Sequence, residues 1–444
     1  MAPVSMVRAT RVWAAIGLNS FGGPAGQIAV MHREVVERRR WVDNDRFIHA
    51  LNFCLLLPGP EAQQLATYLG WLMNGVRGGL IAGTLFVLPG AIVMLAISAI
   101  YTQFGTLWWI QALLAGVQAA VIPIVVQAMV RIGRRTLRSR PLVVISVAAF
   151  LCLILGLPFL LVIGFAALIG ATLGRANPRL LGSDSIPVAV AANPDADAMA
   201  EASRARARKG ALRTAALLLV LWLLPIVMLV FLRPASVFSQ EATLFATASV
   251  ISFGGAYAVL AFVAQQAVAH YQWISLGDMS TGLGLAETTP GPLILVLEFV
   301  GFLAAYRHPG GLPPLMAGTL GALLTLWVVF LPSFVLVFAG APFVERLRHV
   351  RALTSALSGV GAAVVGVIGS LAVTLALGTF FLTVNTISAG PVRMHVPELA
   401  SVRISSVLIA FVAAVLLFLL RWPLLRVLAA CAGLGVLTAL VGWS

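Results

Sequence analysis

The sequence predicts an all-α integral membrane protein, built as an inverted-topology repeat with broken, re-entrant helices. Of its 444 residues, 60% are hydrophobic and only 10% are charged, and the mean hydropathy is +1.01. A soluble protein of this size needs more polar surface than this composition supplies. A stretch rich in glycine and proline occurs twice, and the basic residues are spread unevenly around the two copies. The composition predicts the membrane location, the repeated stretch predicts the two repeats, and the uneven positive charge predicts that the repeats are inverted.

The repeated stretch begins with Ser-Phe-Gly-Gly and ends with Pro-Gly-Pro in both copies. In the first copy these motifs are Ser20-Phe21-Gly22-Gly23, here called the first break, and Pro58-Gly59-Pro60, the first tip. In the second copy they are Ser252-Phe253-Gly254-Gly255, the second break, and Pro290-Gly291-Pro292, the second tip. Each motif lies 232 residues after its counterpart. Proline removes a backbone donor and clashes with the preceding turn, so these motifs predict interrupted membrane helices.

Apolar runs divide the chain into two repeats. We expect an N-terminal repeat (1–174), a flexible cytoplasmic linker (175–211), a connecting transmembrane helix (212–238) and a C-terminal inverted repeat (239–444). The linker is rich in Ala, Pro, Asp and Arg and has no apolar period. Each repeat is expected to hold two broken elements, two long spans and a final pair of helices. In chain order these runs are 7–33, 46–75, 79–101, 107–130, 141–157 and 159–174, then 239–266, 277–305, 315–340, 353–379, 404–420 and 424–441.

The distribution of positive charge predicts the orientation of the two repeats. Arginine and lysine accumulate in the cytoplasmic loops of membrane proteins. If each broken element enters and leaves on one side, 25 of the 29 Lys and Arg residues fall on the cytoplasmic side. The segment 33–46 carries five arginines, whereas its counterpart 265–278 carries no Lys or Arg. This contrast predicts that the repeats are inverted relative to each other.

Helices that break within the membrane expose backbone N–H groups where their second halves begin. These donors and the helix dipole favour an anion, and glycine allows the backbone to approach it closely. Nonhelical backbone persists at that depth only where it is buried in protein or lines a polar cavity. We therefore expect the breaks and tips of both repeats to form one buried anion site. The expected substrate-binding residues are Ser20, Gly22, Gly23, Gly59, Glu61, Gln63, Gln64, Ser252, Gly254, Gly255, Thr288, Thr289 and Gly291.

A structural explanation of the same glycines remains open, because glycine also permits close packing between membrane helices. The series Gly75-x3-Gly79-x3-Gly83 is expected to serve packing of this kind. Among the basic side chains, His32, His49 and Arg77 are candidates for balancing the charge of an anion. Arg77 is expected to extend to the membrane interface instead.

Three acidic residues, Glu61, Glu287 and Glu298, lie in apolar surroundings near the tips. Acidic residues within a membrane are costly and often mark ion or proton pathways. They are candidates for proton coupling beside the anion site. Glu61 has a structural alternative, because it follows the first tip directly and that position suits a carboxylate at a helix N-terminus.

Other classes of function find little support in the sequence. The net charge of +14 fits the positive-inside rule in a membrane protein, and no nucleic-acid partner is expected. The three cysteines, Cys54, Cys152 and Cys431, are isolated in apolar runs without metal-ligand spacing. No Walker loop, G-x-S-x-G motif or haem-like histidine pair occurs. We expect no enzyme activity, no catalytic residues, no metal and no cofactor.

A series of motifs in both repeats matches a known family pattern: Phe21-Gly22-Gly23-Pro24-Ala25-Gly26, His32-Arg33-Glu34, Trp41, Asn52-Phe53-Cys54, Leu57-Pro58-Gly59-Pro60-Glu61-Ala62-Gln63-Gln64 and Gly90, then the second break and Thr289-Pro290-Gly291-Pro292. With these motifs the sequence resembles the chromate ion transporter family in its long two-domain form. The resemblance covers both repeats but not the segment 175–211. The second copy departs from the first, since it has Ala256 in place of Pro24 and lacks the Glu-Ala-Gln-Gln that follows the first tip.

The resemblance implies export of chromate across the bacterial inner membrane, giving chromate resistance, with sulfate as the anion that chromate mimics. The expected partners are therefore a tetrahedral dianion, chromate or sulfate-like, and the lipid bilayer. Two alternatives remain open from the sequence: uptake of sulfate or another dianion, and a membrane scaffold or lipid-handling protein that transports nothing. A homodimer is also left open.

Overall fold

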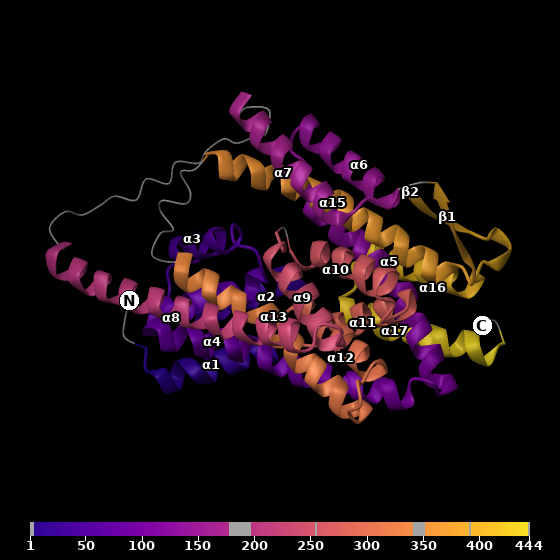
Figure 1. The fold of residues 1–444 in the computed structure, drawn as a ribbon, viewed down its shortest axis with the longest axis horizontal. Helices are drawn as coiled ribbons and strands as arrows, with labels where there is room; N and C mark the ends of the chain where they lie inside the picture. Colours follow the sequence, from indigo (N-terminus) through magenta and orange to yellow (C-terminus); the bar gives the residue numbers. More distant parts are fainter. Residues whose placement is uncertain (1–3, 177–196, 254, 341–350, 390–391, 443–444) are drawn as a thin grey trace.

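The computed structural model describes residues 4–176, 197–253, 255–340, 351–389 and 392–442, and these ranges are almost entirely helical (Figure 1). The first half contains α1 (Met6–Leu18), α2 (Gly23–His32), α3 (Asn44–Cys54), α4 (Glu61–Phe104), α5 (Trp108–Thr136), α6 (Arg140–Ile154) and α7 (Phe159–Ala176). Helix α8 (Asp197–Leu232) connects the halves. The second half contains α9 (Val237–Val250), α10 (Ala256–Ala264), α11 (Leu276–Thr288), α12 (Val296–Arg307), α13 (Pro314–Gly340), α15 (Arg351–Phe380), α16 (Ile404–Ala414) and α17 (Leu424–Leu440).

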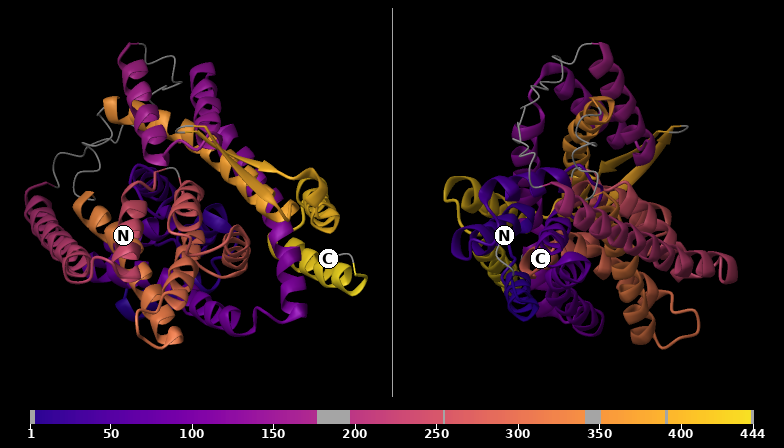
Figure 2. Two further views of the ribbon diagram at one scale, coloured as in Figure 1. Left: turned by 45° about the vertical axis from the view of Figure 1, so that its right-hand side comes forward. Right: turned by 90° about the vertical axis from the view of Figure 1, so that its left-hand side faces the viewer.

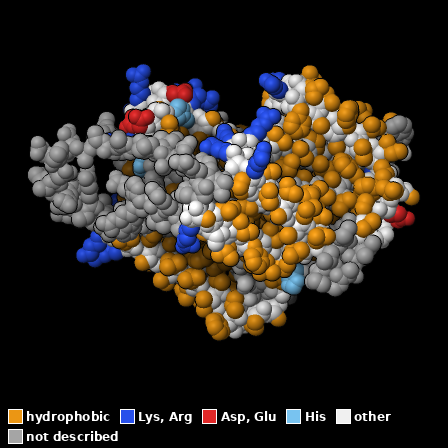
Figure 3. Space-filling view, turned by 90° about the horizontal axis from the view of Figure 1, so that it is seen from above, with side chains coloured by type: hydrophobic (Ala, Val, Ile, Leu, Met, Phe, Trp, Pro, Cys, Tyr) orange, Lys and Arg blue, Asp and Glu red, His pale blue; other side chains and the backbone are white. Residues whose placement is uncertain are grey.

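Six helices in the described ranges are long and apolar enough to cross a membrane. They are α4, α5, α7, α8 from Lys209, α13, and α15 from Thr354. The space-filling view shows a broad hydrophobic surface that carries few charged side chains (Figure 3). Large apolar side chains such as Phe165 and Phe231 are exposed in the structure, as contact with lipid requires. The prediction of an all-α membrane protein is confirmed.

The two halves repeat the same series of elements in the same order. Helices α1, α2 and α3 correspond to α9, α10 and α11, and α5, α6 and α7 correspond to α15, α16 and α17. A π-helical turn follows α2 at Arg33–Arg38, and another follows α10 at Gln265–His270, 232 residues later. Two residues beyond these turns, Arg40 and Gln272 have left-handed backbones, with φ angles of 52° and 53°. The two copies therefore have the same backbone conformation at these equivalent positions.

The helices are interrupted at both breaks and at both tips, as the sequence predicts. The first break separates α1 from α2, and the second separates α9 from α10. The first tip separates α3 from α4, and the second separates α11 from a short 3-10 helix, Leu293–Leu295, that leads into α12. Glycines with positive φ occupy the interruptions: Gly22 (82°), Gly59 (123°), Gly255 (101°) and Gly291 (93°). Residues with a Cβ rarely adopt these conformations, which explains the glycines.

Each tip is the turn of a re-entrant helical hairpin. In the first hairpin α3 runs back along α4, and the rings of Phe53 and Tyr68 lie 5.2 Å apart. In the second hairpin α11 runs back along α12, and the Arg307 guanidinium contacts the Asp278 carboxylate at 2.9 Å. Both arms of each hairpin therefore start and end on the same side of the protein, so the re-entrant prediction is confirmed.

Helix α4 itself folds back on itself at Asn74 and Gly75, which have nonhelical backbones. A Cβ atom at Gly70 would meet the Gly78 carbonyl, and one at Gly83 would meet the Thr67 side chain. The arms 61–73 and 76–104 are therefore antiparallel, and the small residues between them serve packing. The pair α12 and α13 is the equivalent of these two arms in the second half.

The two hairpins have their bases on opposite faces of the protein. At the base of the first hairpin, the Asn74 side chain donates a hydrogen bond to the Val4 carbonyl (2.8 Å), on what we call the first face. From Asn74 the second arm of α4 extends to Tyr101, a distance of about 40 Å at 1.5 Å per residue. There the Tyr101 hydroxyl donates to Asp278 Oδ1 (2.6 Å), at the base of the second hairpin, on the second face. The repeat is thus inverted across the membrane, as predicted.

The halves are intertwined, because the last helices of each half pack on the other half. Helix α17 packs on α5, where a Cβ atom at Gly116 would meet the Cys431 carbonyl. Helix α7 packs on α15 in the equivalent way, where a Cβ atom at Gly359 would meet the Ala166 carbonyl. Figure 2 shows the yellow C-terminal helices beside the purple α5. The two halves therefore form a single folded body.

Two parts of the structure, one in α8 and one in the second half, differ from the expectations. Residues 197–211, expected in the flexible linker, form the first part of α8. The earlier residues 177–196 of that linker lie outside the described residues. An antiparallel β-hairpin, β1 (Val384–Ala389) and β2 (Val392–Pro397), joins α15 to α16 and was not predicted.

Candidate functional site

The tip of each half is hydrogen-bonded to the break of the other half. The Gly59 N–H donates to the Ser252 carbonyl (3.0 Å), and the Gly291 N–H donates to the Ser20 carbonyl (2.8 Å). These four residues occupy equivalent positions in the two copies, so the exchange is reciprocal, as a pseudo-two-fold axis requires. The expected site residues Ser20, Gly59, Ser252 and Gly291 are therefore brought together in two matched pairs.

The tips lie near the middle of the membrane-spanning layer. A Cβ atom at Gly90 would meet the Pro290 carbonyl of the second tip. Gly90 is at the centre of the long arm of α4, about 20 Å from either end. The first tip contacts α13 in the equivalent way, since a Cβ atom at Gly59 would lie 2.6 Å from Ser333 Oγ. Gly90 and Ser333 each follow a proline inside a long helix, Pro89 and Pro332.

Four helices begin at these interruptions without a side-chain cap. They are α2, α4, α10 and the 3-10 helix that leads into α12. Three helices of the same units that begin away from the tips are capped: Asp43 caps α3, Ser236 caps α9, and Ser275 with Asp278 forms a capping box on α11. Helix α1 also begins away from the tips and has no side-chain cap. An uncapped N-terminus leaves backbone N–H groups and the positive end of the helix dipole available for a negative group.

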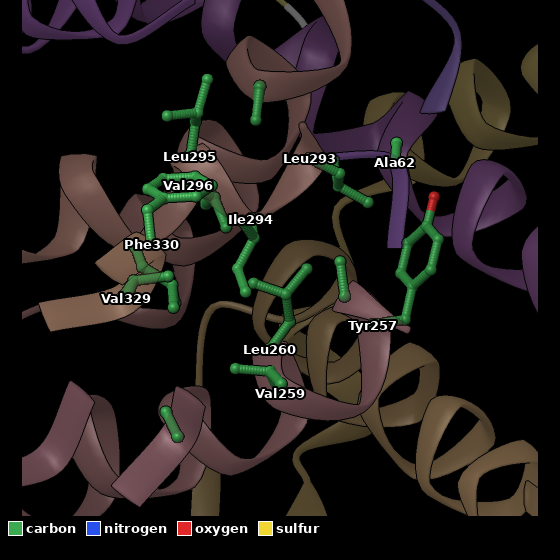
Figure 4. Close-up of a cluster of buried hydrophobic side chains, with 14 of the residues drawn as sticks. Ala62, Tyr257, Val259, Leu260, Leu293, Ile294, Leu295, Val296, Val329 and Phe330 are labelled. Carbon is green, nitrogen blue, oxygen red and sulfur yellow. The ribbon is translucent and has the colours of Figure 1, made fainter. Parts of the chain in front are cut away.

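The uncapped helix starts lie close together in space. Figure 4 shows Ala62 in the first turn of α4, Tyr257 in the first turn of α10 and Leu293 before α12 within one close-up of buried side chains. A Cβ atom at Gly255 would lie 3.4 Å from Glu61 Oε1, which places the Glu61 carboxylate at the start of α10. The start of α2 reaches the second tip through Gln27, whose Nε2 donates to the Gly291 carbonyl (2.5 Å).

Glutamine side chains donate hydrogen bonds to carbonyl groups of both tips. Gln64 Nε2 donates to the Pro58 carbonyl (2.6 Å), as Gln27 does to the second tip. Gln63 is fully buried beside Gln64 and lies 3.5 Å from the Thr67 hydroxyl. Among the described residues, the Oε1 atoms of Gln27, Gln63 and Gln64 have no hydrogen-bond partner. Buried amide oxygens without a partner are rare, and they mark this region as one where a ligand or water completes the bonding.

The glycines of the first break are not explained by helix packing. A Cβ atom at Gly22 or at Gly23 would have no heavy atom within 4 Å, whereas Gly79 and Gly83 pack directly against neighbouring side chains. Positive φ angles of 82° and 69° account for Gly22 and Gly23 instead. The packing explanation therefore holds for Gly79 and Gly83 but not for the first break. Gly75 is explained by its φ of 63° in the turn of α4, since a Cβ atom there would also have no heavy atom within 4 Å. Gly254, in the second break, lies outside the described residues.

The hydroxyl groups expected in the site behave differently from one another. Those of Ser20, Thr288 and Thr289 donate to carbonyls of their own helices, at Ile16, Leu285 and Ala286. The Ser252 hydroxyl is buried and has no partner among the described residues. Of the four expected hydroxyl groups, that of Ser252 therefore has unused bonding capacity. The buried Ser333 hydroxyl beside the first tip also has no partner among the described residues.

The three acidic residues do not share one environment. Glu61 is partly exposed at the helix starts. Glu287 is 4% exposed and accepts a hydrogen bond from the Tyr257 hydroxyl (2.6 Å). Glu298 is 1% exposed, and both of its carboxylate oxygens lack a hydrogen-bond partner among the described residues. The sequence analysis missed Gln27, Tyr257 and the buried Glu241. An acidic or amide residue in an apolar run was the available signal for Gln27 and Glu241, and it does not apply to Tyr257.

The basic candidates lie away from the tips. His32 contacts Glu37 and Asn44 near the first face. His49 and Arg46 line a cavity of about 170 Å³ at the base of the first hairpin, together with Tyr68 and Leu72. Arg77 is exposed just after the turn of α4. No group of three or more potential metal ligands occurs within the described ranges.

The inverted repeat, the re-entrant hairpins and the central cluster of uncapped helix starts define a multi-pass membrane protein of a transporter type. The family model described as chromate transporter matches residues 7–171 and 239–436, and the chain belongs to this family. The match includes both repeats and leaves out the connecting segment, in agreement with the long two-domain form expected from the sequence.

Curated relatives agree with this assignment. The chromate transport protein of Pseudomonas aeruginosa is 33% identical over 371 residues, which cover 81% of this chain and 78% of the relative. The chromate transport protein of Cupriavidus metallidurans is 28% identical, over 81% of this chain and 80% of the relative. The probable chromate transport protein of Synechococcus elongatus is 27% identical, over 84% of each chain. No solved structure matches this chain.

Proposed function

We propose that this protein exports chromate from the bacterial cytoplasm across the inner membrane and so gives chromate resistance. The observation that carries the proposal is the cluster of four uncapped helix starts at mid-membrane, held together by reciprocal hydrogen bonds between tips and breaks. Membership of the family and the names of the relatives supply the identity of the anion.

The proposed site binds a tetrahedral dianion through backbone N–H groups. The donors lie at the starts of α2, α4, α10 and α12, around Gly22, Gly23 and Gly255 and next to Gly59 and Gly291. The remaining members of the proposed substrate-binding set are Ser20, Glu61, Gln63, Gln64, Ser252, Gly254, Thr288 and Thr289. Main-chain donors suit chromate and sulfate equally well, because both present four oxygens and two negative charges.

The inverted halves provide a basis for alternating access. Each half contributes one tip and one break to the centre, so a rocking motion of one half against the other opens the site first to one face and then to the other. The basic residues of the segment 33–46 support a cytoplasmic location of the first face under the positive-inside rule. The segment that follows α7 is then cytoplasmic as well.

Transport into inverted membrane vesicles tests the proposal. With the first face outward, we expect vesicles with the protein to accumulate radiolabelled chromate and control vesicles not to, and we expect sulfate to compete. Preferential movement of sulfate in the opposite direction would favour the uptake transporter. No movement of either anion under any imposed gradient would contradict a transport function and leave the scaffold explanation.

A further inference from the structure

Two acidic side chains and one hydroxyl group are buried where α9, α12 and α13 pack together. Glu241 on α9 is 0% exposed, Glu298 on α12 is 1% exposed and Thr325 on α13 is 1% exposed. The four carboxylate oxygens of Glu241 and Glu298 and the Thr325 hydroxyl have no hydrogen-bond or ion-pair partner among the described residues. Five buried oxygen atoms without partners in one packing region point to a ligand that completes their bonding.

Two glycines bring these groups together. A Cβ atom at Gly321 would lie 3.1 Å from Glu241 Oε2, and one at Gly301 would lie 3.2 Å from the Gly321 carbonyl. The Thr325 hydroxyl fills the space in which a Cβ atom at Gly301 would stand. Glu298 precedes Gly301 by three residues and so lies on the same face of α12. The cluster is therefore built around the contact between Gly301 and Gly321.

No positive side chain from the surrounding elements pairs with the cluster in the described residues. Helix α13 and residues 214–232 of α8 contain no titratable side chain, and Glu241 is the only one on α9. On the other elements packed nearby the titratable groups are Tyr257, Asp278, Glu287, Tyr306 and Arg307, with Glu61, Tyr68, Arg77 and Tyr101 on α4. Of these, Tyr257 bonds to Glu287, while Tyr101 and Arg307 bond to Asp278.

The cluster lies between the second tip and the second face. Glu298 follows the second tip by six residues, or about 9 Å along the helix. Glu241 is in the second turn of α9, close to the end that leads to the second face. The groups are thus arranged in series from that face towards the proposed anion site.

We propose that Glu241, Glu298 and Thr325 form a proton-binding site that couples anion export to proton entry from the second face. The inference depends on the proposed transport function. Binding adds one proton to a carboxylate oxygen to give a carboxylic acid, and release reverses this step with no other bond changed. One proton on each carboxylate leaves the cluster without a buried charge, and an uncompensated buried charge is costly.

Reconstituted protein in liposomes separates coupling from transport itself. We expect Glu241→Gln and Glu298→Gln to keep chromate–chromate exchange without a pH gradient within about threefold of wild type, because exchange does not require net proton movement. We expect accumulation driven by a pH gradient to fall at least tenfold in both variants. Glu37→Gln, an exposed carboxylate at the first face, is the matched control and retains both activities. Membrane insertion and a monodisperse elution profile confirm folding.

Two results would overturn the proposal. One is unchanged accumulation driven by the pH gradient in Glu241→Gln, and the other is wild-type accumulation that depends on a sodium gradient alone. A measurement without substrate separates this inference from the proposed function: infrared spectra during a pH titration report the carbonyl band of protonated carboxylic acids. We expect part of that band to disappear in each glutamine variant, and an unchanged band would refute the site even if no anion is transported.

Discussion

Replacement of Gly291 by valine tests whether the second tip forms part of the transport site. Gly291 has a φ of 93°, and a Cβ atom there would lie 3.2 Å from Leu295 Cδ1 and 3.5 Å from Gly90 Cα. Gly311 provides a matched control, because its φ is 91° and a Cβ atom there would have no heavy atom within 4 Å. The two substitutions share the same backbone strain and differ only in what the side chain meets.

The expected magnitude follows from this difference. The shared backbone strain is about 1–3 kcal/mol. At Gly291 alone, overpacking adds about 1–3 kcal/mol, and loss of the hydrogen bond to the Ser20 carbonyl adds about 0.5–1.5 kcal/mol. The extra cost of roughly 1.5–4.5 kcal/mol applies to the conformation in which the second tip is packed against Gly90 and bonded to Ser20. It lowers the fraction of protein molecules in that conformation on the order of 10- to 1,000-fold.

Chromate exchange in liposomes is the assay, with membrane insertion checked for each variant. We expect Gly291→Val to lose transport by at least tenfold relative to Gly311→Val. Gly59→Val should behave like Gly291→Val, because its Cβ atom would lie 2.6 Å from both Gln64 Nε2 and Ser333 Oγ. Equal transport rates in Gly291→Val and Gly311→Val would refute the role of the tip.

Three further predictions concern the bonds around the tips and the inversion of the repeat. Gln27→Leu leaves the buried Gly291 carbonyl without its donor and should lower the free energy of unfolding, measured in detergent, by about 1–3 kcal/mol. A decrease below about 0.5 kcal/mol would contradict the assigned bond. Tyr257→Phe removes the donor to Glu287 and should cost a similar amount, whereas Tyr306→Phe should have little effect. Single cysteines at the equivalent exposed positions 38 and 270, in a background without native cysteines, should react with impermeant reagents from opposite faces. Reaction from one common face would exclude the inverted topology.

The interruptions of the helices could be predicted because they depend on local chemistry. Glycine and proline in Pro58-Gly59-Pro60 prevent a continuous helix whatever surrounds them, and the second tip repeats the same residues. The inversion could be predicted because charge in short loops reports the side of the membrane. Both inferences use information within a few residues of the feature concerned.

The pairing between the halves could not be predicted in the same way. The bond from Gln27 to Gly291 joins residues 264 positions apart, and nothing near either residue identifies the other. The exchange of α7 and α17 between the halves likewise depends on which small residues meet, such as Gly116 and the backbone at Cys431. Glu241 lies in an apolar run, as Glu287 and Glu298 do, and could have been singled out on that ground. Its position beside Glu298 and Thr325 depends on how α9, α12 and α13 pack and could not be predicted.

In the expected linker, local composition predicted a flexible segment where the structure has a helix. Residues 197–211 are rich in alanine and arginine, which are good helix formers, and they continue the apolar helix that follows them. The polar composition led to the expectation of a flexible segment. Helix propensity next to an established membrane helix was the better guide at this position.

The location of bound chromate tests the central claim most directly. Anomalous scattering from chromium, or a cryo-EM difference map with and without chromate, would place the anion in the structure. We predict density within hydrogen-bonding distance of the backbone N–H groups at the starts of α4 and α10, between Glu61 and Gly255. Density at the Arg46 and His49 cavity alone, or none near either tip, would contradict a site built from main-chain donors of two inverted halves.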